Sequence, residues 1–458
     1  MANLTSGPIG STLLLFALPV LGTNILQALN GTANAFWVSH VLGPAALTAT
    51  TNANQIFFLM MGAMFGLSMA ANLMIGQAIG AGDKVLAKKV IGTCIIFFLG
   101  LSALVGLAGY TLTPAILTAM DTPPDARLDA IIYLRVIFLA IPFMYFFAFI
   151  QMAQRGTGDS RTPFYFSLFA VGLEVCLNPL LILGFGPIPA FGIAGSAMAT
   201  LFCQILTLGL IIAFLARRDS ILILKRPDWG YLVPDREIIS RLFSKGLPMG
   251  LHMFVMSFAA LTMTRFVNSY GSQTAAAYGV AMQMWTYVQM PAMALGMAVS
   301  SMAAQNVGAG RMDRVDRVAA TGVAYAAMLS ALPIGAIYLA GQLAPRLFLP
   351  AGSPSIPIAV HINHFVLWGF IPLGMSLILS GIVRATGSVW PPLLSMIIAL
   401  WGVRVPVAIF LQPMLGPDAV WISFPAGSLT ACGLALAWYR WGNWRTARLL
   451  AASGVEQG

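Results

Sequence analysis

Long apolar segments alternate with short polar ones along the whole chain. Each apolar segment holds about 20 residues or more, the length that an α-helix needs to cross the hydrocarbon core of a bilayer. The pattern therefore predicts twelve membrane-spanning helices. They are expected near residues 12–42, 45–78, 90–116, 130–153, 163–186, 191–216, 246–270, 275–306, 318–344, 357–383, 390–412 and 419–439.

Composition supports an all-α integral membrane protein. Of the 458 residues, 59% are hydrophobic and only 8% are charged, whereas about 25% of the residues in a typical soluble protein are charged. So few charges cannot solvate the surface of a water-soluble globule of this size. The soluble classes of protein are therefore excluded.

Basic residues are distributed unevenly among the connections between the apolar segments. Nineteen of the 24 Lys and Arg residues lie after even-numbered segments or in the C-terminal tail, and the connections after odd-numbered segments hold only Arg127 and Arg346. Because cytoplasmic loops carry the excess of Lys and Arg, we expect a multi-pass protein of the inner (plasma) membrane with both termini in the cytoplasm. This topology also accounts for the net charge of +10, so no nucleic-acid partner is expected.

Three motifs occur twice, once in each half of the chain, and the spacing between the copies is nearly the same for all three. One spacing shared by three separated motifs indicates an internal duplication. Because six is an even number of helices, both halves start on the same side of the membrane, which predicts lobes related by a pseudo-twofold axis along the membrane normal. We expect a first lobe at 1–216, a cytoplasmic linker at 217–245, and a second lobe at 246–458 that ends in a short cytoplasmic tail. The motif pairs are FALPVLGTNI (16–25) with KGLPMGLHMF (245–254), IGQAIGAGDK (75–84) with AAQNVGAGRM (303–312), and QRGTGDSRTP (154–163) with VRATGSVWPP (383–392).

These repeated motifs carry a resemblance to a known family. Together with LNPLLILGFGPIPAFGIAGSAMAT at 177–200, they resemble the bacterial multidrug and toxic compound extrusion (MATE) transporters over nearly the whole chain. The resemblance implies a V-shaped pair of lobes around a central cavity. It also implies export of small compounds in exchange for protons or sodium ions. The glycines of the two GAG motifs are typical of helix C-termini, where a positive backbone angle is needed.

Glu174 is the one acidic residue of fourteen that falls deep inside an apolar segment. It lies about eleven residues into its span, near the middle of the bilayer at ~1.5 Å rise per residue. A charge there costs about 2.5–3.5 kcal/mol on insertion scales. Hydrocarbon favours the protonated carboxyl and water the ionised one, so Glu174 can couple a proton gradient to motion. The alternative is a structural glutamate, held in a buried pair or kept neutral by hydrogen bonds.

Asn178 lies one helical turn after Glu174, on the same face of the helix. The resemblance implies that proton-coupled members carry an asparagine where Glu174 stands and an aspartate where Asn178 stands, so acid and amide look exchanged here. Asn34 stands where the family has a first-helix aspartate, and Met256 stands near the glutamate of some sodium-coupled members. We therefore assign ion coupling to Glu174, Asn178 and Asn34 and favour protons. Sodium remains the alternative, because the amide oxygens could help to bind it.

Further polar residues are candidates for lining a substrate cavity. Asn24, Gln27 and Asn34 recur at helical spacing on the first segment, which indicates either cavity lining or hydrogen bonding between helices. The remaining candidates for the substrate path include Asn54, Met256, Tyr278, Gln283, Trp285 and Arg404.

Arg404 is the only clearly deep base of the second half, and it lies within one residue of the position equivalent to Glu174. Three roles are open for it. It either biases Glu174 electrostatically, is held by backbone carbonyls, or is purely structural. His361 and His364 lack carboxylate or thiolate company, so no metal site is expected.

Secondary active efflux by alternating access is the function that these features favour, with small amphipathic or cationic compounds as cargo and protons as the coupling ion. The alternatives are a sodium-coupled drug antiporter and a lipid or glycolipid flippase of the same superfamily. No paired carboxylates, HExxH motif or nucleophile–base set lies in the spans, so we expect no enzyme activity. We expect a monomer that binds small molecules and membrane lipids and uses no cofactor beyond the ion gradient.

Overall fold

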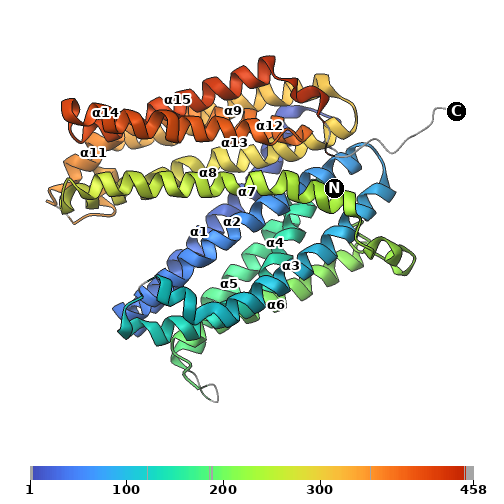
Figure 1. Ribbon diagram of the computed structural model, residues 1–458, viewed down its shortest axis with the longest axis horizontal. Coiled ribbons are helices and arrows are strands. Elements are labelled where there is room, and N and C mark those ends of the chain that lie inside the picture. Colours follow the sequence, from blue (N-terminus) through green and yellow to red (C-terminus); the bar gives the residue numbers. More distant parts are fainter. Residues whose placement is uncertain are drawn as a thin grey trace. The chain divides into compact units, whose positions relative to one another are not determined.

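The structure is a computed structural model that describes residues 4–120, 122–184, 186, 189–350, 352–447 and 449, and the described residues form helices without a β-strand (Figure 1). Eleven of these helices are long and apolar enough to cross a membrane. The exception among the twelve predicted spans is α8 (Ser272–Gly308), a 37-residue helix. Its four glutamines lower its hydropathy.

The helices divide into two compact units. Unit 1 is Gly22–Leu247, and unit 2 joins the described residues up to Leu21 with those from Pro248 onward. Helices α1 (Ile9–Trp37) and α7 (Arg236–Asn268) each contribute to both units. The other helices of unit 1 are α2 (Pro44–Gly80), α3 (Lys84–Ala119), α4 (Pro124–Gly156), α5 (Arg161–Leu183) and α6 (Ile193–Arg217). The other helices of unit 2 are α8, α9 (Met312–Ala340), α10 (Leu343–Arg346), α11 (Ser355–Val366), α12 (Phe370–Thr386), α13 (Trp390–Ile397), α14 (Val405–Leu415) and α15 (Asp418–Trp441).

The two units repeat one packing pattern. In unit 1, α4 packs against α2, α3 and α6, and α5 packs against α6. In unit 2, α12 packs against α8, α9 and α15, and α14 packs against α15. The same neighbours in the same chain order confirm that the chain carries two copies of one six-helix arrangement.

The GAG motifs end helices in both units, as predicted. Helix α2 ends at Gly80 and α8 ends at Gly308. The last glycine of each motif has a positive backbone angle, with φ of 74° at Gly82 and 70° at Gly310. A residue with a Cβ would be strained there, which explains why both copies of the motif place glycine at this position.

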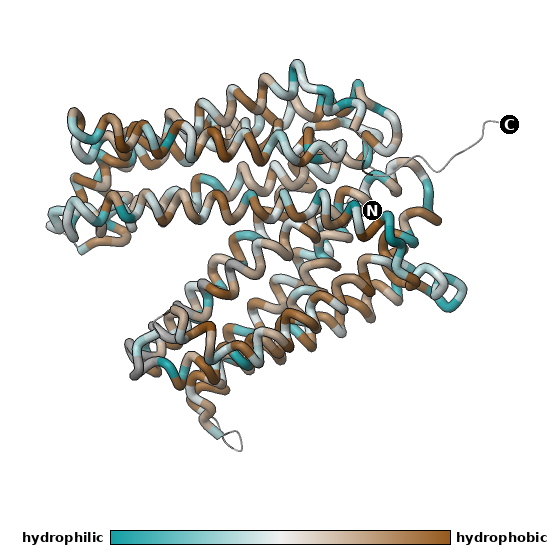
Figure 2. Tube along the Cα trace, in the orientation of Figure 1, coloured by the Kyte–Doolittle hydropathy of each residue, from teal (hydrophilic) through white to brown (hydrophobic). Residues whose placement is uncertain are grey.

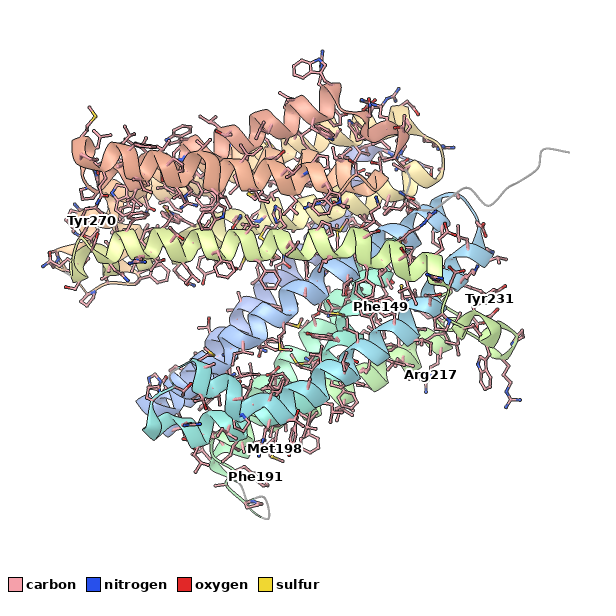
Figure 3. The ribbon with its side chains drawn as sticks, viewed as in Figure 1. Phe149, Phe191, Met198, Arg217, Tyr231 and Tyr270 are labelled. Carbon is pink, nitrogen blue, oxygen red and sulfur yellow. The ribbon has the colours of Figure 1, made fainter. Side chains whose placement is uncertain are left out.

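The segment between α6 and α7 is packed against unit 1. Its 3₁₀ helix η2 (Arg226–Leu232) contacts α3. A Cβ on Gly92 of α3 would lie only 2.2 Å from the Tyr231 backbone oxygen, so this glycine permits the close approach. Figure 2 shows this segment among the more hydrophilic parts of the chain, and Figure 3 shows Tyr231 and Arg217 at one end of unit 1.

Helix α7 begins earlier than the predicted start of the second lobe at residue 246. Its first residue is Arg236, because the Asp235 carboxylate accepts hydrogen bonds from the backbone N–H groups of Glu237 and Ile238 at 2.8 and 3.0 Å. Such capping favours a helix start at this point. The polar stretch between the lobes is therefore partly helical.

Candidate functional site

Glu174 lies on the buried face of α5. The buried residues Ser167, Ala170, Glu174 and Asn178 follow each other at intervals of three or four, which is the spacing of one helix face. This face packs against α6. Glu174 is only 5% exposed and Asn178 only 2% exposed, so packing of the helix holds both polar side chains inside unit 1.

Two neutral side chains hold the Glu174 carboxyl group. Asn30 of α1 donates its Nδ2–H to Glu174 Oε2 at 3.0 Å. The Thr200 hydroxyl of α6 donates to Glu174 Oε1 at 2.6 Å. Each carboxyl oxygen therefore has one partner, and the two partners come from two different helices.

A second set of hydrogen bonds lies one helical turn away and centres on Asn34. Its Oδ1 accepts from Asn178 Nδ2 at 3.1 Å and from the Ser196 hydroxyl at 2.8 Å. The buried Tyr133 of α4 also hydrogen-bonds with Asn34. Among the described residues, Asn178 Oδ1 has no hydrogen-bond partner.

The two sets form one polar cluster built from three i, i+4 pairs. The pairs are Asn30 and Asn34 on α1, Glu174 and Asn178 on α5, and Ser196 and Thr200 on α6. The structure thus brings together Glu174, Asn178 and Asn34, the three residues that the sequence analysis assigned to ion coupling. The partners Asn30, Ser196, Thr200 and Tyr133 were missed. Asn30 could have been found, because it stands one turn before Asn34 on the same helix face.

Among the described residues, Glu174 has no cationic partner. None of the ion pairs between described residues includes it. One form of the structural alternative, a permanent buried ion pair, is therefore not present in this structure. An ionised Glu174 would be an uncompensated charge among neutral groups, which is costly at membrane depth.

Unit 2 contains a cavity of about 190 Å³ that has a different character. It brings together four of the residues predicted to line the substrate path, Met256, Tyr278, Trp285 and Arg404. Most of the other lining residues were missed, because the majority are apolar residues of the kind that is common throughout membrane helices. The lining also includes Gln289, Phe370, Met396, Phe424 and Ser428.

Arg404 is the one charged group among the described residues that line this cavity. Its guanidinium carbon lies 4.8 Å from the centre of the Phe424 ring, a cation–π contact. A Cβ on Gly427 would lie 3.1 Å from Arg404 Cβ, so the glycine leaves room for the arginine stem. Within the described part of the chain, Arg404 takes part in no ion pair, and its Nε is buried without a partner. The predicted alternative of anchoring by backbone carbonyls therefore finds no support.

A π-helical turn, η4 (Ile398–Arg404), ends at Arg404. A π turn holds one more residue than an α turn, because its hydrogen bonds run from i to i+5. The nearby motifs align Gly158 with Gly387, and the same spacing would align Glu174 with Val403, directly before Arg404. The extra residue of η4 accounts for this difference, so Arg404 is the repeat counterpart of Glu174.

Four of the predicted cavity residues lie elsewhere. Asn24 and Gln27 are on the unit 1 part of α1, half-buried and exposed respectively, and Asn54 is exposed on α2. Gln283 is exposed on α8 and donates to the Tyr287 hydroxyl at 3.3 Å. None of the four lines the unit 2 cavity.

One of the two histidines, His361, has a carboxylate partner from a distant part of the sequence. The sequence analysis found no carboxylate near His361, but the structure places Asp418 Oδ1 2.8 Å from His361 Nε2. Asp418 is 57 residues further along the chain, so inspection of the local sequence could not find it. Among the described residues, no group of three or more His, Cys, Asp or Glu side chains could hold a metal ion.

Comparisons with known proteins agree across sequence and structure. The MatE family profile matches residues 19–180 and 248–410. The second match is longer than the first by a single position, which fits one extra residue in the second half. The chain is 34% identical to the probable multidrug resistance protein YoeA of Bacillus subtilis, over 95% of both chains. It is 30% identical to the probable multidrug resistance protein YpnP of the same organism, over 98% of both chains.

Solved structures show the same fold. An outward-facing multidrug resistance MATE transporter of the MOP superfamily matches with a TM-score of 0.87 at 22% identity, over 95% of this chain and 96% of that chain. A mutant of the Vibrio cholerae MATE transporter VcmN matches with a TM-score of 0.87 at 19% identity, over 94% of this chain and 96% of that chain.

Proposed function

The chain belongs to the MATE (MatE) family of multidrug transporters, and on that premise we propose that it is a proton-coupled antiporter that exports small amphipathic or cationic organic compounds by alternating access. It is an integral membrane protein and not an enzyme. Relatives named multidrug resistance and multidrug export proteins, among them MepA of Staphylococcus aureus at 24% identity, support drug efflux as the activity.

The single observation that carries proton coupling is the set of partners around Glu174. Asn30 and Thr200 are neutral, and no cation among the described residues balances the carboxylate. Because a lone charge is unfavourable at this depth, the buried site favours the protonated carboxyl, and exposure to water in another conformation would favour loss of the proton. Uptake on one side and release on the other would couple the proton gradient to transport. Each proton moved through 100 mV supplies about 2.3 kcal/mol.

The first test replaces the titrating group. Glu174→Gln keeps the size and hydrogen-bonding capacity of the side chain but cannot exchange a proton. In proteoliposomes with an imposed pH gradient, we expect efflux of a fluorescent cationic dye to fall to the level of protein-free vesicles. Full gradient-driven efflux by Glu174→Gln would contradict the assignment.

A relocated carboxylate provides the matched control. Asn178 stands one turn along the same face and hydrogen-bonds to Asn34. Glu174→Asn alone should abolish gradient-driven efflux, and the double variant Glu174→Asn, Asn178→Asp should recover part of it. Recovery would show that the requirement is an acid on this face. If the double variant stays inactive while it folds and binds dye as the wild type does, the exact position of Glu174 is essential.

Sodium coupling is the second candidate, and one observation favours it. Among the described residues, Asn178 Oδ1 is a buried oxygen without a hydrogen-bond partner, on a side chain whose Nδ2–H donates to Asn34 Oδ1. Hard cations prefer several oxygen ligands. Wild-type efflux driven by a sodium gradient at equal pH on both sides would establish sodium as the ion. Efflux that follows only the pH gradient would establish the proton.

The remaining parts of the proposal follow from the charge pattern and the family. We place the protein in the cytoplasmic (inner) membrane with both termini in the cytoplasm, because the basic connections lie on one side. Small molecules and membrane lipids are its proposed partners, and we expect it to act as a monomer without a cofactor.

A further inference from the structure

The unit 2 cavity combines one isolated cation with aromatic walls, and we propose that it is a binding site for a small aromatic carboxylate. The guanidinium of Arg404 would pair with the carboxylate, and the rings of the cavity would pack against the ring of the ligand. The cavity lies wholly within unit 2, so the proposal concerns a site separate from the polar cluster around Glu174.

The charge of the cavity determines the sign of the ligand. None of the described lining residues is acidic, and Arg404 has no ion-pair partner among the described residues. A buried cation without a counter-charge is unfavourable. An anion that enters the cavity supplies that counter-charge, while an organic cation is repelled. The guanidinium is also planar and matches a carboxylate with two parallel hydrogen bonds.

The aromatic residues that line the cavity indicate the shape of the uncharged part of the ligand. Trp285 contacts Phe424 with ring centres 5.9 Å apart, and Phe370 contacts Phe424 at 4.7 Å. Trp285 donates its indole N–H to Asn363 Oδ1 at 2.9 Å, so its one polar group is already satisfied. Three neighbouring aromatic rings therefore line the cavity, and such a lining suits a flat ring better than a flexible acyl chain.

The volume of the cavity limits the size of the ligand. Pockets for drug-sized ligands measure about 300–1,000 Å³, whereas this cavity is about 190 Å³. It therefore suits a ligand of one or two fused rings. Met256, Met282 and Met396 also line it, and flexible methionine side chains can adapt to rings of different outline.

The experiment is equilibrium dialysis of three compounds against the full-length protein in maltoside micelles, with protein-free micelles subtracted. The compounds are 2-naphthoate, its neutral amide 2-naphthamide, and the cation 2-naphthylmethylamine, which share one ring system. We expect 2-naphthoate to bind one-to-one and at least about tenfold more tightly than the amide, with no saturable binding of the amine. Equal binding of acid and amide by the wild-type protein would overturn the proposal without any variant.

Variants then locate the site. Arg404→Gln should reduce the affinity for 2-naphthoate to that for the amide, and Arg404→Lys should keep part of the preference because it keeps the charge. Arg265→Gln is the matched control, since Arg265 is an exposed arginine of unit 2 on α7 outside the cavity lining. If Arg404→Gln folds and still prefers the acid, or if Arg265→Gln loses the preference equally, the assignment to this cavity is wrong. Binding is measured at equilibrium without an ion gradient, so its failure is distinct from a failure of proton coupling.

Discussion

At the scale of single residues, the polar cluster of unit 1 shows which functional side chains can be recognised from the sequence. Glu174 stands out because an acid in an apolar helix is costly. Thr200 and Ser196 do not, because small hydroxyl residues are common in membrane helices, where they hydrogen-bond across helix contacts. Their roles depend on the packing of α6 against α5, which the sequence does not reveal. The sequence could identify the acid and its amide neighbours, but not the Thr200 hydroxyl that donates to it.

A glycine at the start of α6 allows this packing. A Cβ on Gly195 would lie 2.3 Å from the Leu181 backbone oxygen of α5. The close approach of the two helices brings Ser196 and Thr200 within reach of the α1 and α5 side chains. Gly209 lies on the same helix, and a Cβ there would meet nothing within 4 Å.

Substitution of these two glycines by alanine should therefore have opposite effects. Gly195→Ala forces the backbones of α5 and α6 apart, and we expect it to destabilise unit 1 by about 1–3 kcal/mol and to reduce dye efflux. Gly209→Ala should stabilise the protein by about 0.4–1 kcal/mol through its better helix propensity. Thermal unfolding of the two variants in detergent measures the difference. Equal melting temperatures would contradict the close-packing argument.

At the scale of elements, periodicity predicted where the spans lie, but not how their ends and irregular turns are built. The third span was predicted at 90–116, and α3 extends from Lys84 to Ala119. The first turns carry Lys84, Lys88 and Lys89, which are compatible with a helix but not with hydrocarbon, so hydropathy alone places the start of the helix too late. The π turn η4 could not be distinguished by composition, because its residues resemble those of the α-helical turns beside it. Its only trace was the one-residue shift between repeats.

The linker shows a similar limit. Its polar composition predicted a cytoplasmic connection, and the structure adds two ion pairs that dock it on α3. Lys88 Nζ lies 2.8 Å from Asp228 Oδ1, and Lys89 Nζ lies 2.6 Å from Asp235 Oδ2. The hydrogen bond from Lys88 lowers the pKa of Asp228 below its ordinary value of 3.8, and the hydrogen bond from Lys89 does the same for Asp235.

These pKa shifts predict that the docking of the linker on α3 does not change across the physiological pH range. A carboxyl with a lowered pKa in the folded state contributes stability above its unfolded pKa and loses it only as the pH falls through the folded value. Both folded pKa values lie below 3.8. We therefore expect hydrogen exchange of residues 226–232, corrected for intrinsic rates, to show equal protection at pH 5 and pH 8.

Removal of one partner of these ion pairs, unlike a change of pH, should weaken the docking of the linker. Asp228→Asn should raise exchange in this segment at both pH values. Asp219→Asn is the control, because its pair with Lys225 lies at the surface, with side chains 76% and 63% exposed. A wild-type linker that loses protection between pH 8 and pH 5 would show that another group controls its docking.

At the scale of the whole molecule, duplication has produced two copies of one helix arrangement that carry side chains of opposite charge at equivalent positions. The repeated motifs predicted the two halves, and the packing of α4 and α12 repeats accordingly. The equivalent positions carry Glu174 in unit 1 and Arg404 in unit 2. Sequence reasoning found both residues, because a charge in an apolar segment is rare in either lobe. It could not show that the acid sits among neutral hydrogen-bonding groups while the base faces an aromatic cavity.

Because the two sites share no residue, we expect substitutions in them to have independent effects. The sequence analysis left open whether Arg404 biases Glu174 electrostatically. In this structure each residue has its contacts within its own unit, and the two sites share no residue. Substitutions at sites without shared partners usually add. We therefore expect Arg404→Gln to leave the pH dependence of cationic dye efflux unchanged, and Glu174→Gln to leave 2-naphthoate binding unchanged.

Measurement of both variants and the double variant in the same two assays tests this independence. If Arg404→Gln shifts the midpoint of the pH profile, the arginine acts on the titrating glutamate, because removal of a cation changes the balance between its ionised and neutral forms. If Glu174→Gln weakens 2-naphthoate binding, the two sites are coupled through a change of conformation, and linkage requires that the aromatic acid also alters proton binding. If neither variant alters the other site's readout, the two sites act independently, as expected if the two lobes have divided proton exchange and anion recognition between them.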